Sequence, residues 1–285
     1  MEPPKLLRIG IIQVLTGVDK ADNLRRTDQL ARAAAGEGAE LIVLPEMFAC
    51  PYEPAAFSKN AEAFPDGECY RFLAELARNT GAWIVGGSLP EREGNRIYNS
   101  SFIYDTAGKL QGVHRKIHLF DVNFHSLSFR ESTVIQPGNT PTLINTPWGR
   151  LGVLICYDLR FPELSRWYAL RGAGMIAVPA AFNRVTGSQH WNILFRTRAV
   201  DNQVFIFGAS PATNPGNSYQ AYGHSLVVDP MGRVLGELGK QEGYLVQEID
   251  LDELTRTRNS LPLLRHRRPD LYALKPEMEN YTPWP

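Results

Sequence analysis

Cys156 stands where a buried strand gives way to a helix. The apolar run Leu151–Ile155 predicts the strand, and Pro162 with Glu163 opens a helix that extends to Leu170. Pro is favoured at the first helical position because its missing N–H would have no intrahelical partner there. The carboxyl ends of strands are where open α/β sheets form their sites. Free N–H groups and the helix dipole favour a thiolate, so we expect this turn to lower the pKa of Cys156 and make it a nucleophile.

A lone Cys at a strand end is more often a small buried apolar residue, so other residues have to support this assignment. Three charged side chains stand where charge is unexpected. Glu46 follows the apolar run Leu41–Leu44, Lys116 lies in a segment that alternates like a strand, and Glu131 lies in an irregular connection. Most Glu and Lys residues are solvated surface charges. Their unexpected positions nevertheless make all three candidate site residues beside Cys156.

Strands and helices alternate in the elements that must position these residues. Apolar runs predict strands at 7–14, 41–44 and 83–87, and helical spacing predicts helices at 19–36 and 69–81. Beyond residue 97 the pattern predicts three hairpins, further strands at 175–181, 204–209 and 244–249, and helices at 189–202 and 251–258. We therefore expect an α/β fold with two mixed β-sheets packed face to face and helices outside, a four-layer α-β-β-α sandwich. Residues 1–285 are expected to form a single domain, with a core at 7–272 and an irregular tail at 273–285.

The overall composition argues against several classes of partner. Thirty basic and thirty acidic residues give zero formal charge, which favours a small-molecule substrate over nucleic acid or an anionic membrane. The three cysteines show no paired-ligand spacing, so neither a disulfide framework nor a zinc cluster is expected. No run approaches the ~20 apolar residues of a membrane span. With no signal-peptide pattern at the N-terminus, these features predict a cytoplasmic protein.

Three short motifs resemble the signatures of the nitrilase superfamily of carbon–nitrogen hydrolases. They are Leu-Pro-Glu46, His-Arg-Lys116-Ile-His and Ile-Cys156-Tyr-Asp-Leu-Arg-Phe-Pro-Glu. Their order and separation match the family, and further matching stretches lie between residues 181 and 202. The resemblance covers nearly the whole chain.

The resemblance implies a role for each site residue. Cys156 would attack the carbonyl carbon, and Glu46 would accept the thiol proton and later deliver one to the leaving ammonia. Lys116 and the backbone N–H of Tyr157 would stabilise the oxyanion. Glu131 would keep the charges around Lys116 in order, and water activated by Glu46 would hydrolyse the thioester. None of these steps needs a metal or a cofactor.

The residues after the cysteine indicate which bond is cut. True nitrilases typically have Trp-Glu there, whereas this chain has Tyr157-Asp158, which argues for an amide. The chain looks most like the omega-amidase branch, which cuts the side amide of 2-oxoglutaramate or 2-oxosuccinamate. The carboxylate of such a substrate calls for a cation, for which Arg160 and Arg184 are candidates, with Tyr52 as a hydroxyl donor. Arg184 stands where a smaller residue is expected in close relatives, so a different acid stays open.

Other functions remain possible at this stage. N-carbamoyl amino-acid or amide hydrolysis, or amide hydrolysis of deaminated glutathione, would use the same four residues. A metal hydrolase could use His114 and His118, but their spacing brings them together only on a helix and their segment predicts a strand, so we expect them to pack around Lys116. An inactive interaction protein on the same fold would be expected to lose a catalytic residue, and none is lost. The resemblance also implies a homodimer or higher homo-oligomer, formed through helices near 163–172 and 189–202.

Overall fold

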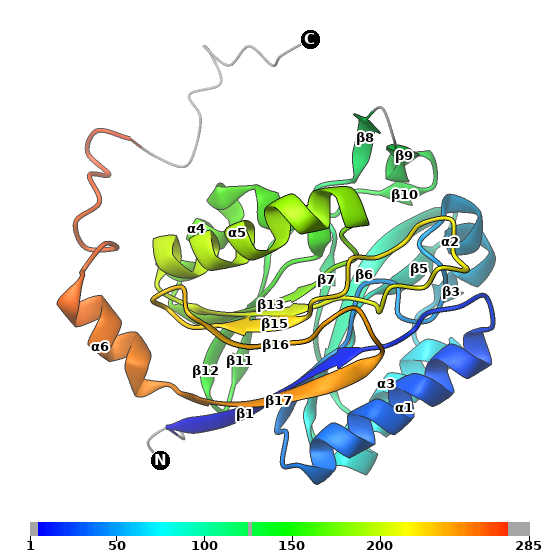
Figure 1. Ribbon diagram of the computed structural model, residues 1–285, viewed down its shortest axis with the longest axis horizontal. Coiled ribbons are helices and arrows are strands. Elements are labelled where there is room, and N and C mark those ends of the chain that lie inside the picture. The colour runs from blue at the N-terminus through cyan, green and yellow to red at the C-terminus, as the bar shows by residue number, and fades with distance from the viewer. Residues whose placement is uncertain (1–4, 125–126, 273–285) are drawn as a thin grey trace.

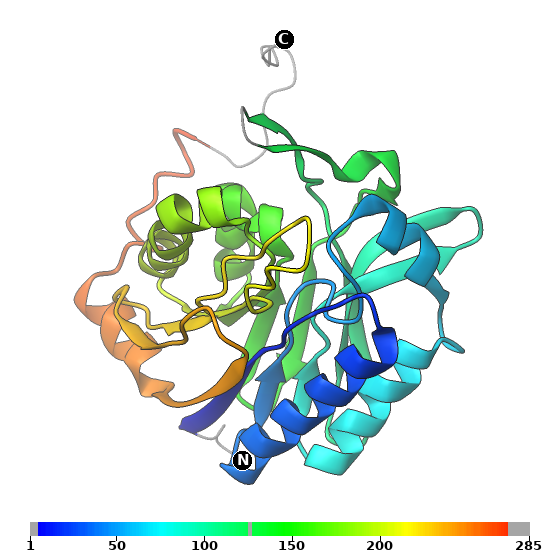
Figure 2. The same ribbon diagram turned by 45° about the vertical axis from the view of Figure 1, so that its right-hand side comes forward.

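Two β-sheets lie face to face at the centre of the molecule, with helices on both outer sides (Figures 1 and 2). The computed structural model describes residues 5–124 and 127–272. The first sheet has the order β17-β1-β2-β4-β6-β5-β3, with β7 and β10 also paired to β6. Its strands are β1 (Leu6–Gln13), β2 (Leu41–Val43), β3 (Glu62–Ala63), β4 (Trp83–Val85), β5 (Leu89–Glu93), β6 (Arg96–Tyr104), β7 (Leu110–Arg115), β10 (Ile135–Gln136) and β17 (Gly243–Asp250).

The second sheet has the order β11-β12-β13-β14-β15-β16. Its strands are β11 (Thr142–Thr146), β12 (Gly149–Val153), β13 (Ala173–Pro179), β14 (Phe205–Ala209), β15 (Leu226–Val228) and β16 (Val234–Glu237). Each sheet is mixed, because three central strands run parallel and antiparallel strands flank them. A separate hairpin pairs β8 (Asp121–Phe124) with β9 (Leu127–Arg130).

The helices cover the outer faces of the two sheets. On one outer side, α1 (Lys20–Gly36) and α3 (Glu68–Thr80) pack on the first sheet. On the opposite outer side, α4 (Pro162–Leu170) and α5 (Arg184–Asn202) pack on the second. The remaining helices are α2 (Pro54–Asn60), α6 (Asp252–Ser260) and the short 3-10 helices η1 (Glu131–Thr133) and η2 (Cys156–Arg160). No helix in the described ranges is long and apolar enough to cross a membrane.

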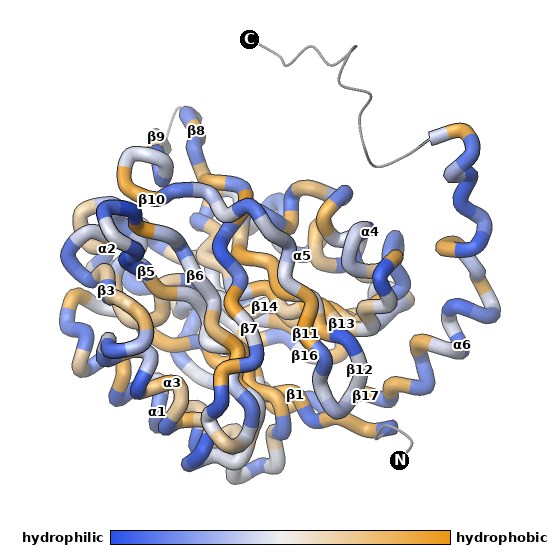
Figure 3. The backbone as a smooth tube through the Cα atoms, turned by 180° about the vertical axis from the view of Figure 1, so that it is seen from behind, coloured by the Kyte–Doolittle hydropathy of each residue, from blue (hydrophilic) through white to orange (hydrophobic). Residues whose placement is uncertain are grey.

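Side-chain alternation along the central strands produces three apolar interfaces. In β13, Met175 and Ala177 face the first sheet, whereas Ile176 and Val178 pack with α4 and α5. A strand buried on both faces has to be apolar at every position, which explains its unbroken hydrophobic run. Figure 3 shows the hydrophobic residues concentrated along the central strands. The predicted four-layer α-β-β-α sandwich is confirmed.

Several predicted boundaries are wrong, and local hydrogen bonds explain two of them. The strand predicted for the segment that contains His114, Lys116 and His118 ends at Arg115, because the amides of Ile117 and His118 donate to the Asp158 side chain instead of a strand partner. The helix expected from residue 189 begins at Arg184, where the Asn183 side chain accepts the amide of Thr186 as an N-cap.

Short elements escaped prediction altogether. The helix α2, the strands β3 and β5, and the β8–β9 hairpin are too short for a clear periodicity. The connection expected to be irregular between residues 120 and 137 contains that hairpin, η1 and β10. The tail predicted at 273–285 lies outside the described residues.

Candidate active site

The structure brings Glu46, Lys116, Glu131 and Cys156 together from four separate segments. Glu46 follows β2, Lys116 follows β7, Glu131 opens η1, and Cys156 opens η2 after β12. The first two segments belong to the first sheet and the Cys156 segment to the second. Glu46, Lys116 and Glu131 are fully buried, and Cys156 is 4% exposed. Buried charges at this density require partners, and each one has them.

Lys116 lies at the centre of the cluster. Its Nζ donates to Glu46 Oε1 at 2.8 Å, to Glu131 Oε2 at 2.8 Å and to the Tyr52 hydroxyl at 3.1 Å. Asn99 Nδ2 donates to Oε1 of Glu46 and of Glu131, at 2.9 and 3.0 Å. Burial disfavours the ammonium, but the charges of Glu131 and Glu46 outweigh it and raise the pKa of Lys116. Lys116 is therefore positively charged.

The two carboxylates differ in the oxygens they have free. Both oxygens of Glu131 are occupied, because Oε2 also accepts the amide of Phe120 at 2.8 Å. Glu46 Oε2 is buried and has no hydrogen-bond partner among the described residues. Burial raises the pKa of Glu46, more than Lys116 lowers it. Glu46 is thus the carboxylate that has an oxygen available to accept a proton.

Cys156 occupies a strained backbone position at the start of η2. Its φ is 48°, a left-handed value that costs a non-glycine residue on the order of 1–3 kcal/mol. The thiol interacts with the Glu46 carboxylate and with the backbone N–H of Ala181. A nucleophile held on a tight turn against a base is the geometry that thiol attack requires.

The expectation that the turn lowers the pKa of Cys156 is wrong. Burial raises this pKa well above its usual value, and the charge of Glu46 adds to the effect, whereas Lys116 opposes it. The helix dipole has little influence because η2 separates Cys156 from the start of α4 at Pro162. The resting residue is therefore a thiol, and attack requires a base to take its proton.

The other predicted site residues take varied positions. Tyr52 is buried beside Lys116. The N–H of Tyr157 lies in the first turn of η2, where helical N–H groups lack an intrahelical acceptor. The Arg160 guanidinium contacts His190 Nδ1 at 3.1 Å and stacks on Phe182.

Arg184 donates to Gln220 at 3.2 Å on the exposed surface. Both predicted cations, Arg160 and Arg184, are therefore engaged with other side chains of the protein.

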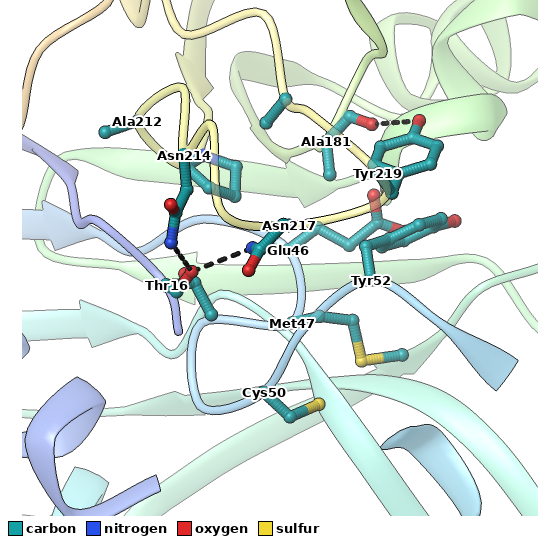
Figure 4. A pocket seen from close by; sticks show the side chains of 12 residues that line it. Thr16, Glu46, Met47, Cys50, Tyr52, Ala181, Ala212, Asn214, Asn217 and Tyr219 are labelled. Carbon is teal, nitrogen blue, oxygen red and sulfur yellow. Dashed lines mark hydrogen bonds between the residues drawn. The ribbon is translucent and has the colours of Figure 1, made fainter. Parts of the chain in front are cut away.

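A small cavity adjoins Glu46 (Figure 4). Its volume of about 20 Å³ has room for about one water molecule, so entry of an amide requires surrounding side chains to move. Neutral residues make up the rest of the described lining: Thr16, Met47, Cys50, Tyr52, Ala181, Pro211, Ala212, Asn214, Asn217, Tyr219 and Ala221. Figure 4 shows Asn214 and Asn217 pointing to Thr16, whose backbone carbonyl accepts from both at 2.9 Å.

The histidine pair does not pack around Lys116 as expected. His114 and His118 both contact the buried carboxylate of Asp158, at 3.1 and 2.8 Å. Asp158 was missed as a site residue, although a charged residue two positions after the candidate nucleophile was a usable signal. Within residues 5–124 and 127–272, no group of three or more His, Cys, Asp or Glu side chains is arranged to hold a metal ion.

Comparisons with known proteins agree on one family. The carbon–nitrogen hydrolase family matches residues 8–259. Omega-amidase NIT2 of Danio rerio is 42% identical over 273 residues, which cover 95% of this chain and 98% of the relative. Omega-amidase NIT2 of Homo sapiens is 41% identical over 269 residues, 94% of this chain and 97% of the relative.

Solved structures show the same relationship. Nit3 of Saccharomyces cerevisiae, a member of branch 10 of the nitrilase superfamily, has a TM-score of 0.87 and 39% identity, covering 93% of this chain and 98% of that one. An amidase from Nesterenkonia sp. has a TM-score of 0.78 and 30% identity, covering 93% and 94%. The chain therefore belongs to the carbon–nitrogen hydrolase family, in the nitrilase superfamily, and is a hydrolase that acts on amides.

Proposed function

We propose that this protein hydrolyses the side amide of small carboxylate-bearing ω-amides, such as 2-oxoglutaramate or 2-oxosuccinamate, through a thioester on Cys156. The observation that carries the mechanism is the buried cluster in which Lys116 joins two carboxylates and only Glu46 keeps an oxygen available beside the thiol. The substrate class is supported by the similarity to proteins named omega-amidase NIT2.

The first step transfers the thiol proton as the new bond forms. Sγ of Cys156 attacks the amide carbon, its proton passes to Glu46 Oε2, and the carbonyl electron pair moves onto oxygen. Because burial raises the pKa values of both groups, the proton moves from a weakly acidic thiol to an unusually basic carboxylate. Glu46 then delivers this proton to the leaving nitrogen, and ammonia departs.

The oxyanion needs donors that the resting cluster already uses. All three N–H bonds of the Lys116 ammonium have partners. The contact with the neutral Tyr52 hydroxyl is the longest of the three, so we propose that the substrate oxygen replaces Tyr52. The N–H of Tyr157 completes the oxyanion site.

The second half of the reaction regenerates the thiol. Water gives a proton to Glu46 and attacks the thioester carbon, and the proton returns to sulfur as the C–S bond breaks. Glu131, with both oxygens occupied, keeps Lys116 charged and in place and takes no proton itself.

The distant carboxylate of the substrate needs polar or cationic partners. The described cavity lining offers hydroxyl and amide groups, and we propose that Tyr52, one of the lining residues, binds substrate. Arg160 and Arg184 would have to leave His190 and Gln220 to pair with the substrate, and they stay candidates for that role.

We also propose that the protein is a homodimer through the outer face of α5. Ile193 and Val200 line one surface hollow and are 64% and 38% exposed, and the neighbouring Met231 is 52% exposed. Apolar side chains gathered on one outer layer are typical of association surfaces.

Ammonia release from a panel of substrates tests the function. The panel contains 2-oxoglutaramate, 2-oxosuccinamate, glutamine, an aliphatic amide, an N-carbamoyl amino acid and a nitrile. Hydrolysis of deaminated glutathione is followed separately by release of its peptide amine, because its amide nitrogen does not leave as ammonia. We expect release from the oxo-acid amides by the wild type and none by Cys156→Ala. Strong release from the carbamoyl compound alone would keep the mechanism and overturn the substrate. Activity that survives in Cys156→Ala would overturn the nucleophile.

A further inference from the structure

Asp158 is a fully buried carboxylate that accepts five hydrogen bonds. Its Oδ1 accepts the amides of Ile117 and His118 at 3.2 and 2.9 Å, and His118 Nδ1 at 2.8 Å. Its Oδ2 accepts His114 Nε2 and the amide of Ile155, both at 3.1 Å. A carboxylate can be buried at this depth only when such donors compensate for lost water.

The donors come from both catalytic segments. Ile117 and His118 directly follow Lys116, whose backbone N–H donates to Asn99 of β6 in the first sheet. Ile155 directly precedes Cys156, and its strand β12 belongs to the second sheet. Asp158 therefore joins the backbone segment that carries Lys116, beside the first sheet, to the segment that carries Cys156, beside the second. It contacts neither the ammonium nor the thiol.

The imidazoles of the two histidines stiffen this connection. The ring of His118 lies between Asp158 and Phe161, on which it stacks with a centroid distance of 3.6 Å and an interplanar angle of 10°. The ring of His114 is fully buried. Burial raises the pKa of Asp158, but the hydrogen bonds from His114 and His118 outweigh it and hold that pKa well below its usual range. The carboxylate is ionised, so the ring nitrogens that face it carry protons.

We propose that Asp158 is a positioning residue that fixes the Lys116 ammonium relative to the Cys156 thiol, with His114 as its principal side-chain support. The proposal rests on the proposed function, because it assigns Asp158 a share in the rate of the same reaction. Positioning matters at this scale, since a displacement of about 1 Å can cost about 100-fold in rate.

Asp158→Asn is the direct test because it preserves shape. The amide can present its oxygen to only one set of donors, and its NH2 group then faces the amide of Ile155 or those of Ile117 and His118. Two donors facing each other repel, so the two segments separate. We expect kcat to fall about 100-fold with KM within threefold of wild type, because the cavity lining is unchanged.

Asp229→Asn is the matched control. Asp229 is 1% exposed and, like Asp158, accepts backbone amides, but its donors are Met231 and Arg233 in the turn between β15 and β16. We expect this variant to lose thermal stability and keep the wild-type kcat per folded molecule. Equal kcat values for Asp158→Asn and Asp229→Asn, at a similar loss of melting temperature, would assign Asp158 a merely structural role and overturn the proposal.

A pair of milder variants covers the case in which Asp158→Asn does not fold. His114→Gln keeps a nitrogen donor near the position of Nε2, whereas His114→Leu removes it at similar volume. We expect His114→Gln to keep kcat within threefold and His114→Leu to lose at least tenfold. If both retain the wild-type kcat, Asp158 does not act through this contact and the proposal fails.

A structural readout separates this inference from the proposed function. Crystal structures of the wild type and Asp158→Asn, or His114→Leu, need no substrate. We expect the Lys116 segment to shift relative to Cys156 by more than about 0.5 Å, the tolerance of a productive site. If the wild type is inactive on the proposed substrates and the variant still shows this shift, only the proposed substrate class is wrong. An unshifted variant would overturn the positioning role whatever the substrate is.

Discussion

Every N–H bond of Lys116 has a partner before any substrate arrives. This arrangement keeps a buried ammonium stable, and it also means that oxyanion stabilisation requires an exchange of partners. The two neighbouring carboxylates differ in their hydrogen bonds, because both oxygens of Glu131 have donors whereas Glu46 Oε2 has none among the described residues. That difference fits the separate roles that the family resemblance implies for them.

Gln substitutions at the two glutamates separate those roles. Glu46→Gln removes the available base, and we expect kcat to fall by about 10² to 10⁴-fold at every pH. Glu131→Gln keeps an oxygen for Lys116 but removes one of the charges that raise the pKa of Lys116. We therefore expect a smaller loss near neutral pH and an alkaline limb of the rate profile that moves to lower pH, because the ammonium loses its proton sooner.

Rates of ammonia release across the pH range check both expectations, and each variant is the control for the other. A Glu46→Gln variant as active as Glu131→Gln would show that Glu46 is not the base.

Among the elements, long segments with strong patterns were predictable and short ones were not. The central strands are apolar at every position and α1 and α3 have clear helical spacing, so composition along the chain indicates them directly. Glu46 and Lys116 were recognisable as charges beside apolar runs. Asp158 offered a signal in its position two residues after Cys156, but the stretch Tyr-Asp-Leu-Arg is mixed, so its burial was not evident. Its donors on residues 114 to 118 are tertiary contacts, which spacing does not reveal.

The contact between α5 and β14 is so close that one added methyl group is expected to lower the free energy of unfolding. A Cβ on Gly208 would lie 2.5 Å from a ring carbon of Phe195. We expect Gly208→Ala to lower the free energy of unfolding by about 1–3 kcal/mol through overpacking. Gly36→Ala is the control, since a Cβ there meets nothing within 4 Å and the position ends a helix. Urea unfolding of both variants decides, and a wild-type stability for Gly208→Ala would contradict the close packing.

For the whole molecule, the order of the layers followed from the alternation of strands and helices. Association was harder to predict, because the sequence pattern does not distinguish apolar residues of an interface from apolar residues of the core. Trp191 and Phe195 could have served an interface or the interior, and both are buried within the chain. Two of the exposed apolar residues of α5, Ile193 and Val200, line a hollow on its outer surface.

Substitution on that face tests the proposed homodimer. We expect light scattering to give twice the chain mass of 31.9 kDa for the wild type and the single mass for Ile193→Asp, because an interface cannot bury an unpaired carboxylate. Val18→Asp is the control, as Val18 is 86% exposed and precedes α1 on the opposite outer layer. A single-chain mass for the wild type at micromolar concentration would remove the proposal.

The division of the site between the two sheets has a consequence for folding. Glu46 and Lys116 are carried by segments of the first sheet, and Cys156 by a segment of the second. Either half, folded alone, would hold a base and an ammonium without a nucleophile, or a thiol without a base. Reactivity therefore arises only when the apolar faces of the sheets meet, so catalysis depends on contacts between residues that are far apart in the sequence.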